Sequence, residues 1–444
     1  MKLWQKDKPS LKEIESFTVG NDRIMDMYLA EYDVLGSLAH IAMLQTIGLL
    51  DREEQKILNT ELKKIHQLIK DGKFVIEEGV EDIHSQVELL LTRTLGDVGK
   101  KIHSGRSRND QVLVDLKLFF REEIKKIIQE ISLLFQLLQT LSEKHKDQLL
   151  PGYTHLQLAM PSSFGLWFGA YAESLIDDVA SWQATYTLVN KNPLGSAAGY
   201  GSSFPLNRSL TTQLLGFDEL HYNVVYAQMS RGKTERFLAQ SIGNTAATLS
   251  RLAMDVTLYL NQQFSFISFP DELTTGSSIM PHKKNPDVFE LIRGKCNTLQ
   301  NLPAEIALMT VNLPSGYHRE MQLLKEKVFP AFQTLTECIR MTAYMLQSVR
   351  VRKDILRESQ YKYLFSVEEV NRLVLQGIPF RDAYRQVGQA IESNTFTYTP
   401  EVHHTHEGSI GNLCTAQIRK MMETQLAGFS FEKSDQAMQM LLQS

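Results

Sequence analysis

The feature that most constrains the fold is a run of apolar residues that recurs at every third or fourth position across residues 112–149. This spacing places the apolar side chains on one face of an α-helix, which at 1.5 Å per residue would reach about 50 Å. The alternation of two that is typical of strands is almost absent from the chain. The sequence therefore predicts an all-α fold. The repeating residues are Ile124, Ile127, Ile128, Ile131, Leu134, Phe135, Leu138 and Leu141.

Four more stretches have the length and periodicity of long helices. They cover residues 164–188, 233–260, 287–303 and 321–350, the last with Pro330 as an expected kink. Five long helices in succession predict a central bundle.

The helical runs divide the chain into three predicted domains. An N-terminal helical domain covers residues 1–110, the long-helix bundle 111–355, and a C-terminal helical domain, interrupted at residues 377–380, covers 356–444. Residues 164–172 are apolar around most of a helix circumference, which indicates burial on more than one side. We therefore expect the bundle to pack against further copies of the chain.

Composition argues against several function classes. The formal net charge is −4, and the basic residues do not gather into a stripe that would bind nucleic acid. No uninterrupted apolar stretch is long enough for a membrane span, and the N-terminus turns polar at once. The three cysteines form no metal-binding pair, so we expect no metal site and buried thiols in a reducing compartment, which indicates a cytoplasmic location. They are Cys296, Cys338 and Cys414.

Polar residues cluster in four breaks between the predicted helices. The most informative break, residues 275–287, reads Thr-Gly-Ser-Ser-Ile-Met-Pro-His-Lys-Lys-Asn-Pro-Asp just ahead of a helix. A helix N-terminus favours anions, so its lysines and Asn285 predict a cradle for a carboxylate. Taken alone, an ordinary polar surface loop would explain the same residues.

The other breaks carry complementary chemistry. Residues 152–157 place Thr154 beside His155, a donor next to a proton shuttle, although a lone histidine is more often structural. Residues 103–111 combine two arginines with Asn109, and arginine forks match carboxylates. In the fourth break, Gln322 and Lys325 share one face of a starting helix and Tyr317 lies in the preceding turn, an arrangement that also suits a solvated face.

Together the four breaks resemble the signature regions of the fumarase/aspartase superfamily, whose members eliminate fumarate from a succinyl compound. The Gly-Arg-Ser-Arg-Asn-Asp-Gln and Gly-Tyr-Thr-His-Leu-Gln segments at residues 105–111 and 152–157 are similar to its argininosuccinate lyase and δ-crystallin branch. The resemblance implies a cofactor-free homotetramer that splits argininosuccinate into arginine and fumarate, with each active site shared between three subunits.

The resemblance also implies roles for individual residues. Ser277 matches the base that removes the Cβ proton, and His155 the general acid at the leaving nitrogen, although the two roles can be exchanged. Glu290 matches the carboxylate that orients the histidine, and Lys283 the cation that stabilises the intermediate. The implied substrate-binding residues are Arg108, Asn109, Thr154, Ser278, Asn285, Tyr317, Gln322 and Lys325.

Some positions depart from the branch pattern. His282 is more familiar from adenylosuccinate lyases, and Asp22 stands where the branch has a substrate-contacting serine. An aspartate there could still accept a hydrogen bond from a substrate amine. Adenylosuccinate lyase, fumarase and a non-catalytic crystallin-like protein therefore remain as alternatives. The glycine-rich residues 193–201 lack a P-loop lysine and are interpreted as a structural turn.

Overall fold

The structure is a computed structural model that describes residues 12–443. Helices dominate it, and the strands of the described part pair only as four two-stranded ribbons, so the predicted all-α class is confirmed. No helix among the described residues is long and apolar enough to cross a membrane.

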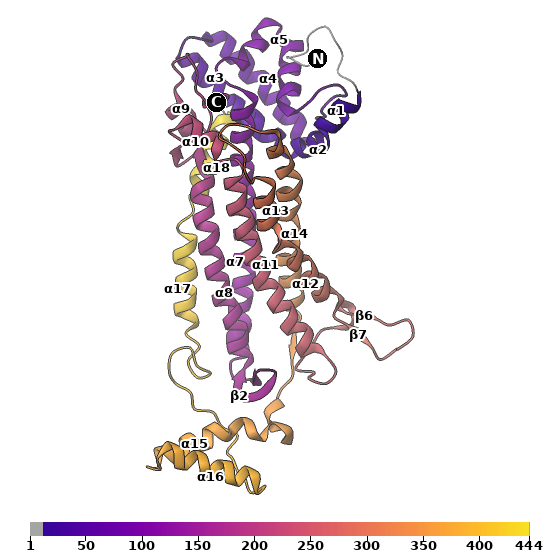
Figure 1. Cartoon of the computed structure of the whole chain (residues 1–444), viewed down its shortest axis with the longest axis vertical. Coiled ribbons are helices and arrows are strands. Elements are labelled where there is room, and N and C mark those ends of the chain that lie inside the picture. The colour runs from indigo at the N-terminus through magenta and orange to yellow at the C-terminus, as the bar shows by residue number, and fades with distance from the viewer. Residues whose placement is uncertain (1–11, 444) are drawn as a thin grey trace.

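The five predicted long helices run side by side along the long axis of the molecule (Figure 1). Each predicted helix is found, and Pro330 lies inside the last of them. The first helix begins and ends a few residues earlier than predicted, and the fourth is followed by a separate short helix. The bundle helices are α7 (Arg108–Lys144), α8 (Phe164–Val189), α11 (Lys233–Leu260), α12 (Asp287–Leu299), α13 (Leu302–Met309) and α14 (Leu324–Leu346).

One continuous apolar core holds these helices together. Phe120 and Phe332, from α7 and α14, are fully buried with ring centroids 6.0 Å apart. Burying a side chain of this size contributes about 1.5–3 kcal/mol each. Trp182 of α8 is also fully buried, and its indole N–H donates to Thr245 of α11 at 3.0 Å. Hydrogen bonding satisfies the one polar atom that the indole brings into the core.

A second core closes the upper end of the bundle. Most of its residues come from the first hundred residues of the chain, but Val114 and Leu118 of α7 and Leu441 near the C-terminus also contribute. The helices here are α1 (Lys12–Val19), α2 (Asp22–Asp26), α3 (Ala30–Thr46), α4 (Arg52–Lys70), α5 (Ile83–Leu95), α6 (Asp97–Lys100), α9 (Arg208–Leu214) and α10 (Val224–Met229).

The C-terminal part of the chain differs from the predicted single unit at residues 356–444. Helices α15 (Ser366–Leu375) and α16 (Phe380–Glu392) lie at the lower end, with the predicted break between them. The chain then returns upward, because α17 (Thr415–Leu426) packs along α8 and α18 (Phe431–Gln443) contacts α3 and α9. Cys414, predicted to be buried, is only half-buried at the start of α17.

Short strands replace predicted helix ends and loops at several places. Residues 149–163, expected to be the end of one long helix and the break before the next, form an antiparallel hairpin. The four ribbons are β1 (Leu149–Thr154) with β2 (Gln157–Ser163), β3 (Lys191–Asn192) with β4 (Glu219–Leu220), β5 (Ile267–Ser268) with β8 (Arg350–Val351), and β6 (Thr275–Gly276) with β7 (Lys284–Asn285).

Candidate active site

A polar pocket at the upper end of the bundle brings together two of the four predicted segments. It lies where α2, the starts of α5 and α7, the short 3-10 helix η4 (Arg319–Leu323) and the start of α14 meet. The predicted residues Arg108, Asn109, Tyr317, Gln322 and Lys325 all line it. So do residues that sequence reasoning did not assign to a site, namely Asp26, Glu81, Asp82, His84, Val112, Arg231 and Arg319, together with Asp22.

The start of α7 fixes Arg108 and presents Asn109. Ser107 caps the helix in a capping box with Asp110, which defines where the helix begins. The Arg108 guanidinium then donates to Glu81 at 3.1 Å and to Ser85 at 2.7 Å. The Asn109 side-chain amide makes no hydrogen bond within residues 12–443, so it is available to a ligand.

Asp110 explains the glycine-rich turn after α8. This fully buried carboxylate accepts hydrogen bonds from the backbone N–H groups of Gly195 and Ala197, both at 2.9 Å. The turn therefore wraps around the N-terminus of α7 and supports it, in agreement with its interpretation as a structural turn.

Lys325 is held by two carboxylates rather than standing free. Its side chain is 4% exposed, and its ammonium forms ion pairs with Asp26 at 2.6 Å and with Asp22. The second oxygen of Asp26 accepts the N–H of Ile83 at 3.2 Å, at the first residue of α5. The start of α14 is thereby joined to α2 and α5 through one buried charge cluster.

Gln322 and Arg319 tie the pocket to the end of α1. The Gln322 amide donates to the carbonyls of Thr18 and Val19 at 3.2 and 3.1 Å. Arg319 donates to the Thr18 carbonyl at 2.8 Å and pairs with Glu81 at 3.3 Å. Because these contacts use the side-chain N–H groups of Gln322, its side-chain carbonyl oxygen remains available to a ligand.

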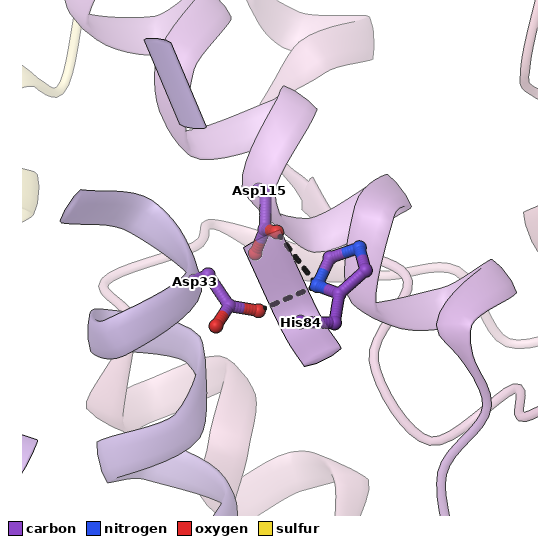
Figure 2. Close-up of side chains that lie close together, drawn as sticks. All are labelled: Asp33, His84 and Asp115. Carbon is purple, nitrogen blue, oxygen red and sulfur yellow. Dashed lines mark hydrogen bonds and ion pairs between the residues drawn. The ribbon is translucent and has the colours of Figure 1, made fainter. Parts of the chain in front are cut away.

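Asp33, His84 and Asp115 form a buried cluster (Figure 2), and His84 is its member that lines the pocket. The three residues come from α3, α5 and α7. His84 Nδ1 lies 2.7 Å from Asp33 and 3.6 Å from Asp115. Burial alone would lower the pKa of His84, but the Asp33 and Asp115 carboxylates outweigh it and raise the pKa to about 9. An imidazolium therefore joins the three helices and supports the wall of the pocket that His84 lines.

The predicted proton shuttle lies at the tip of the β1–β2 hairpin. Thr154 and Gln157 pair, and the two residues between them, His155 and Leu156, have φ angles of 56° and 57°. Positive φ at both central residues is the geometry of a tight hairpin turn, which usually takes asparagine or glycine. Thr154, His155 and Leu156 are all exposed, and Leu156 is 75% exposed.

The 275–287 loop stands out from the side of the bundle between β6 and β7 (Figure 1). Ser277 Oγ accepts two backbone N–H groups, from Ile279 at 3.2 Å and Met280 at 3.0 Å. Lys284 pairs with Asp271, whereas Lys283 has no ion-pair partner in the described part of the chain. Of the remaining predicted residues, Asn285 is half-buried in β7, and Ser278 and Glu290 are exposed.

One chain does not bring the predicted groups together in one pocket. Helix α7 has 37 residues, so its ends lie about 55 Å apart. Asn109 is at its upper end, whereas the hairpin that carries His155 lies at the lower end of the bundle (Figure 1). The pocket at the upper end contains none of Thr154, His155, Ser277 or Lys283.

Comparison with known proteins identifies relatives of this chain. A family described as Lyase matches residues 14–300. Argininosuccinate lyases from Bacteroides fragilis and Parabacteroides distasonis are each 60% identical over 99% of both chains. The argininosuccinate lyase of Thermotoga neapolitana is 38% identical over 87% of this chain and 98% of that protein.

Solved structures share the fold. A variant of EDDS lyase with bound fumarate has a TM-score of 0.77 at 21% identity, covering 97% of this chain and 93% of that one. The fumarate lyase:delta crystallin protein from Brucella melitensis has a TM-score of 0.72 at 16% identity, covering 91% of each chain. On the strength of its full-length sequence relatives, this chain belongs to the argininosuccinate lyase family.

Proposed function

We propose that this chain eliminates fumarate from argininosuccinate, releasing L-arginine, in a cytoplasmic homotetramer whose active sites each combine segments of three chains. The observation that carries this assembly is the separation of the signature segments within one chain. The pocket residues, the His155 hairpin and the 275–287 loop occupy three different places along a bundle whose first helix is about 55 Å long. Neighbouring copies must therefore supply the missing groups.

The surface of the bundle supports association with further copies. A groove between α7, α12 and α14 has a volume of about 790 Å³. Leu133, Leu291, Met341 and Tyr344 line it and are each between 43% and 64% exposed. A contiguous apolar groove of this kind is typical of an interface. We expect a second copy of the chain to fill this groove, because the proposed active site is incomplete without one.

The chemistry starts at Cβ of the succinyl moiety. Ser277 Oγ takes the Cβ proton, and the electron pair moves into the adjacent carboxylate to form an aci-carboxylate dianion. The C–N bond then breaks, fumarate forms, and His155 gives a proton to the leaving guanidino nitrogen. In the opposite assignment, His155 is the base and Ser277 is the acid. Kinetic measurements distinguish the two assignments.

The environment of Ser277 suits a base. A serine oxygen is weakly basic unless hydrogen bonds and a cation favour its alkoxide form. The two N–H groups on Ser277 Oγ supply the hydrogen bonds, and the unpaired Lys283 is available as the cation. Lys283 and Asn285 would also meet the second negative charge of the dianion, where electrostatic stabilisation contributes most. Glu290 would orient His155 from a neighbouring chain.

Recognition of the arginine half falls to the pocket at the upper end. Asn109, Gln322 and Tyr317 present polar groups there, with Arg108 and Lys325 held in place behind them. Thr154 and Ser278 would bind the succinyl half. The 60% identity to argininosuccinate lyases favours argininosuccinate over the substrates of adenylosuccinate lyase and fumarase.

Fumarate release tests the proposal. The purified chain should produce fumarate from argininosuccinate, which is followed by its ultraviolet absorbance, and should leave adenylosuccinate and malate unchanged. Fumarate release from adenylosuccinate alone would contradict the substrate assignment. Release from none of the three would favour a non-catalytic relative.

A further inference from the structure

The tip of the β1–β2 hairpin has no polar anchor of its own in one chain. Thr154, His155 and Leu156 are exposed, and their side chains make no hydrogen bond or ion pair within residues 12–443. Tyr153 directly precedes them in β1, and its half-buried side chain contacts other parts of the chain. The position of His155 therefore depends on how Tyr153 is held.

Tyr153 is held by an aromatic stack and by a hydrogen bond. Its ring stacks on Phe264, with centroids 5.6 Å apart and an interplanar angle of 24°, and Phe264 stacks in turn on Phe266. Its hydroxyl donates to the hydroxyl oxygen of Tyr361, which lies in the short 3-10 helix η6 (Ser359–Phe365). Burial raises the pKa of Tyr153 to about 12, and Tyr361 adds to the rise, so this donor keeps its proton at neutral pH.

Tyr361 is itself held in place, which makes it a fixed acceptor for Tyr153. Its side chain is buried, and Arg352 also donates to its hydroxyl oxygen. Arg352 is oriented by an ion pair with Glu358 at 3.0 Å and by a hydrogen bond to the carbonyl of Phe264 at 3.2 Å. Helix η6 also packs against both strands of the hairpin. The lower end of the bundle and the segment after α14 thus hold the hairpin together.

We propose that Tyr361 is a positioning residue for the elimination, because its hydrogen bond with Tyr153 fixes how the hairpin presents His155 to the substrate. This inference rests on the proposed function, which gives His155 its role in proton transfer. His155 and Leu156 form a tight turn with positive φ at both residues, so the tip follows the strand that carries Tyr153. A group that transfers a proton must lie within hydrogen-bond reach of the reacting atom, so a displaced tip lowers turnover more than affinity.

Tyr361→Phe tests this role, because it removes the hydroxyl and keeps the ring. We expect kcat to fall about threefold to tenfold, the effect of losing one neutral hydrogen bond, with KM for argininosuccinate changed by less than about twofold. Tyr153→Phe removes the donor of the same hydrogen bond, so the double variant should be no slower than either single variant. In a His155→Asn background, Tyr361→Phe should not lower kcat further, because Tyr361 acts through His155.

Hydrogen–deuterium exchange of the assembled protein gives a readout that does not depend on turnover. In Tyr361→Phe the amides of residues 149–163 should exchange about threefold faster or more. Tyr363→Phe is the matched control, since Tyr363 lies in the same helix and its hydroxyl makes no hydrogen bond within residues 12–443. It should change neither the exchange of the hairpin nor kcat.

Two results would overturn the role of Tyr361. One is unchanged exchange of residues 149–163 in Tyr361→Phe, and the other is a further loss of kcat when this change is added to His155→Asn. Failure of the wild type to release fumarate from argininosuccinate would instead overturn the proposed function. The exchange measurement would then still decide whether Tyr361 holds the hairpin.

Discussion

Two regions of the proposed site differ in how much of their environment one chain provides. One is the pocket at the upper end of the bundle. The other consists of the two segments proposed to react with the succinyl half. In the pocket, Arg108, Gln322 and Lys325 are already held by carboxylates or backbone carbonyls of the same chain. In the hairpin and the 275–287 loop, His155 and Lys283 are exposed, and Lys283 has no ion-pair partner in the part of the chain that the structure describes.

In the proposed mechanism, the pocket therefore recognises the substrate, and the hairpin and the loop transfer protons. A single chain builds a charge-paired wall in the pocket proposed to bind the arginine half, because buried charges must be paired for the chain to fold. Of the groups proposed to move protons, His155 is exposed and Ser277 is half-buried in one chain, and both would gain their environment from neighbouring copies. Changes in the first region should therefore affect stability and affinity, and changes in the second should affect turnover with little effect on folding.

The largest effect is expected from the buried cluster of Asp33, His84 and Asp115. His84→Asn leaves Asp33 and Asp115 without the imidazolium that pairs with them. Breaking a buried ion pair costs about 3–5 kcal/mol, so the free energy of unfolding should fall by about that amount. Denaturant titration at a fixed chain concentration measures it. His403→Asn, at an exposed histidine, is the matched control, and an equal loss in both variants would refute a special role for the cluster.

Turnover should respond most to the exposed segments. Ser277→Ala and His155→Asn should each lower kcat by about a hundredfold or more, the scale of acid–base contributions, with an unchanged thermal midpoint. Lys284→Gln alters an exposed lysine of the same loop that pairs with Asp271 and should change kcat much less. Near-normal turnover by Ser277→Ala or by His155→Asn would remove that residue from the mechanism.

Affinity should respond to the pocket. Lys325→Ala removes a charge from the pocket proposed to bind the arginine half, and we expect KM for argininosuccinate to rise by about tenfold to a hundredfold. Inhibition by fumarate or succinate should change less, because these ligands lack the arginine half. Since Asp22 and Asp26 lose their cation, the variant should be assayed well below its thermal midpoint. If the binding of argininosuccinate and of fumarate weakened equally, Lys325 would lie at the half of the site that binds fumarate, contrary to the proposal.

The smallest effect concerns the pH dependence of stability. The pKa of His84 is raised in the folded chain to about 9, above the value of about 6.5 expected when the chain unfolds. The stabilisation from this imidazolium is therefore complete below about pH 6.5 and is lost as the pH rises through about 9. The thermal midpoint of the wild type should fall over this range more than that of His84→Asn. Parallel pH profiles of the two proteins would contradict the assignment.

The sequence predicts the bundle well because the signal for it is local. Apolar residues three and four apart in α7 fix which face is buried, whatever lies opposite. The hairpin at His155 could not be predicted in this way, because neither His155 nor Leu156 is a residue that usually adopts positive φ. The pairing of β1 with β2, rather than local preference, fixes that turn.

Five of the residues that line the pocket belong to the set predicted from the sequence, but how they pair could not be predicted. Lys325 and Asp22 are separated by about three hundred positions, and no local pattern indicates that they form an ion pair. The buried cluster did leave a signal, since Asp115 interrupts the apolar run from Val114 to Leu116 in the middle of a buried helix face. A charged residue at such a position needs a buried partner, and His84 supplies it.

Mixed assembly of two inactive variants tests most directly the claim that neighbouring chains complete the site. Ser277→Ala and Asn109→Ala alter the loop and the pocket, which lie apart in one chain. When the two are unfolded together in equal amounts and reassembled, about a quarter of the sites should draw Ser277 and Asn109 from intact copies. We expect fumarate release from argininosuccinate to recover to about that fraction of the wild-type rate. Activity no higher than that of either parent, in samples shown to contain mixed tetramers, would mean that each site lies within one chain.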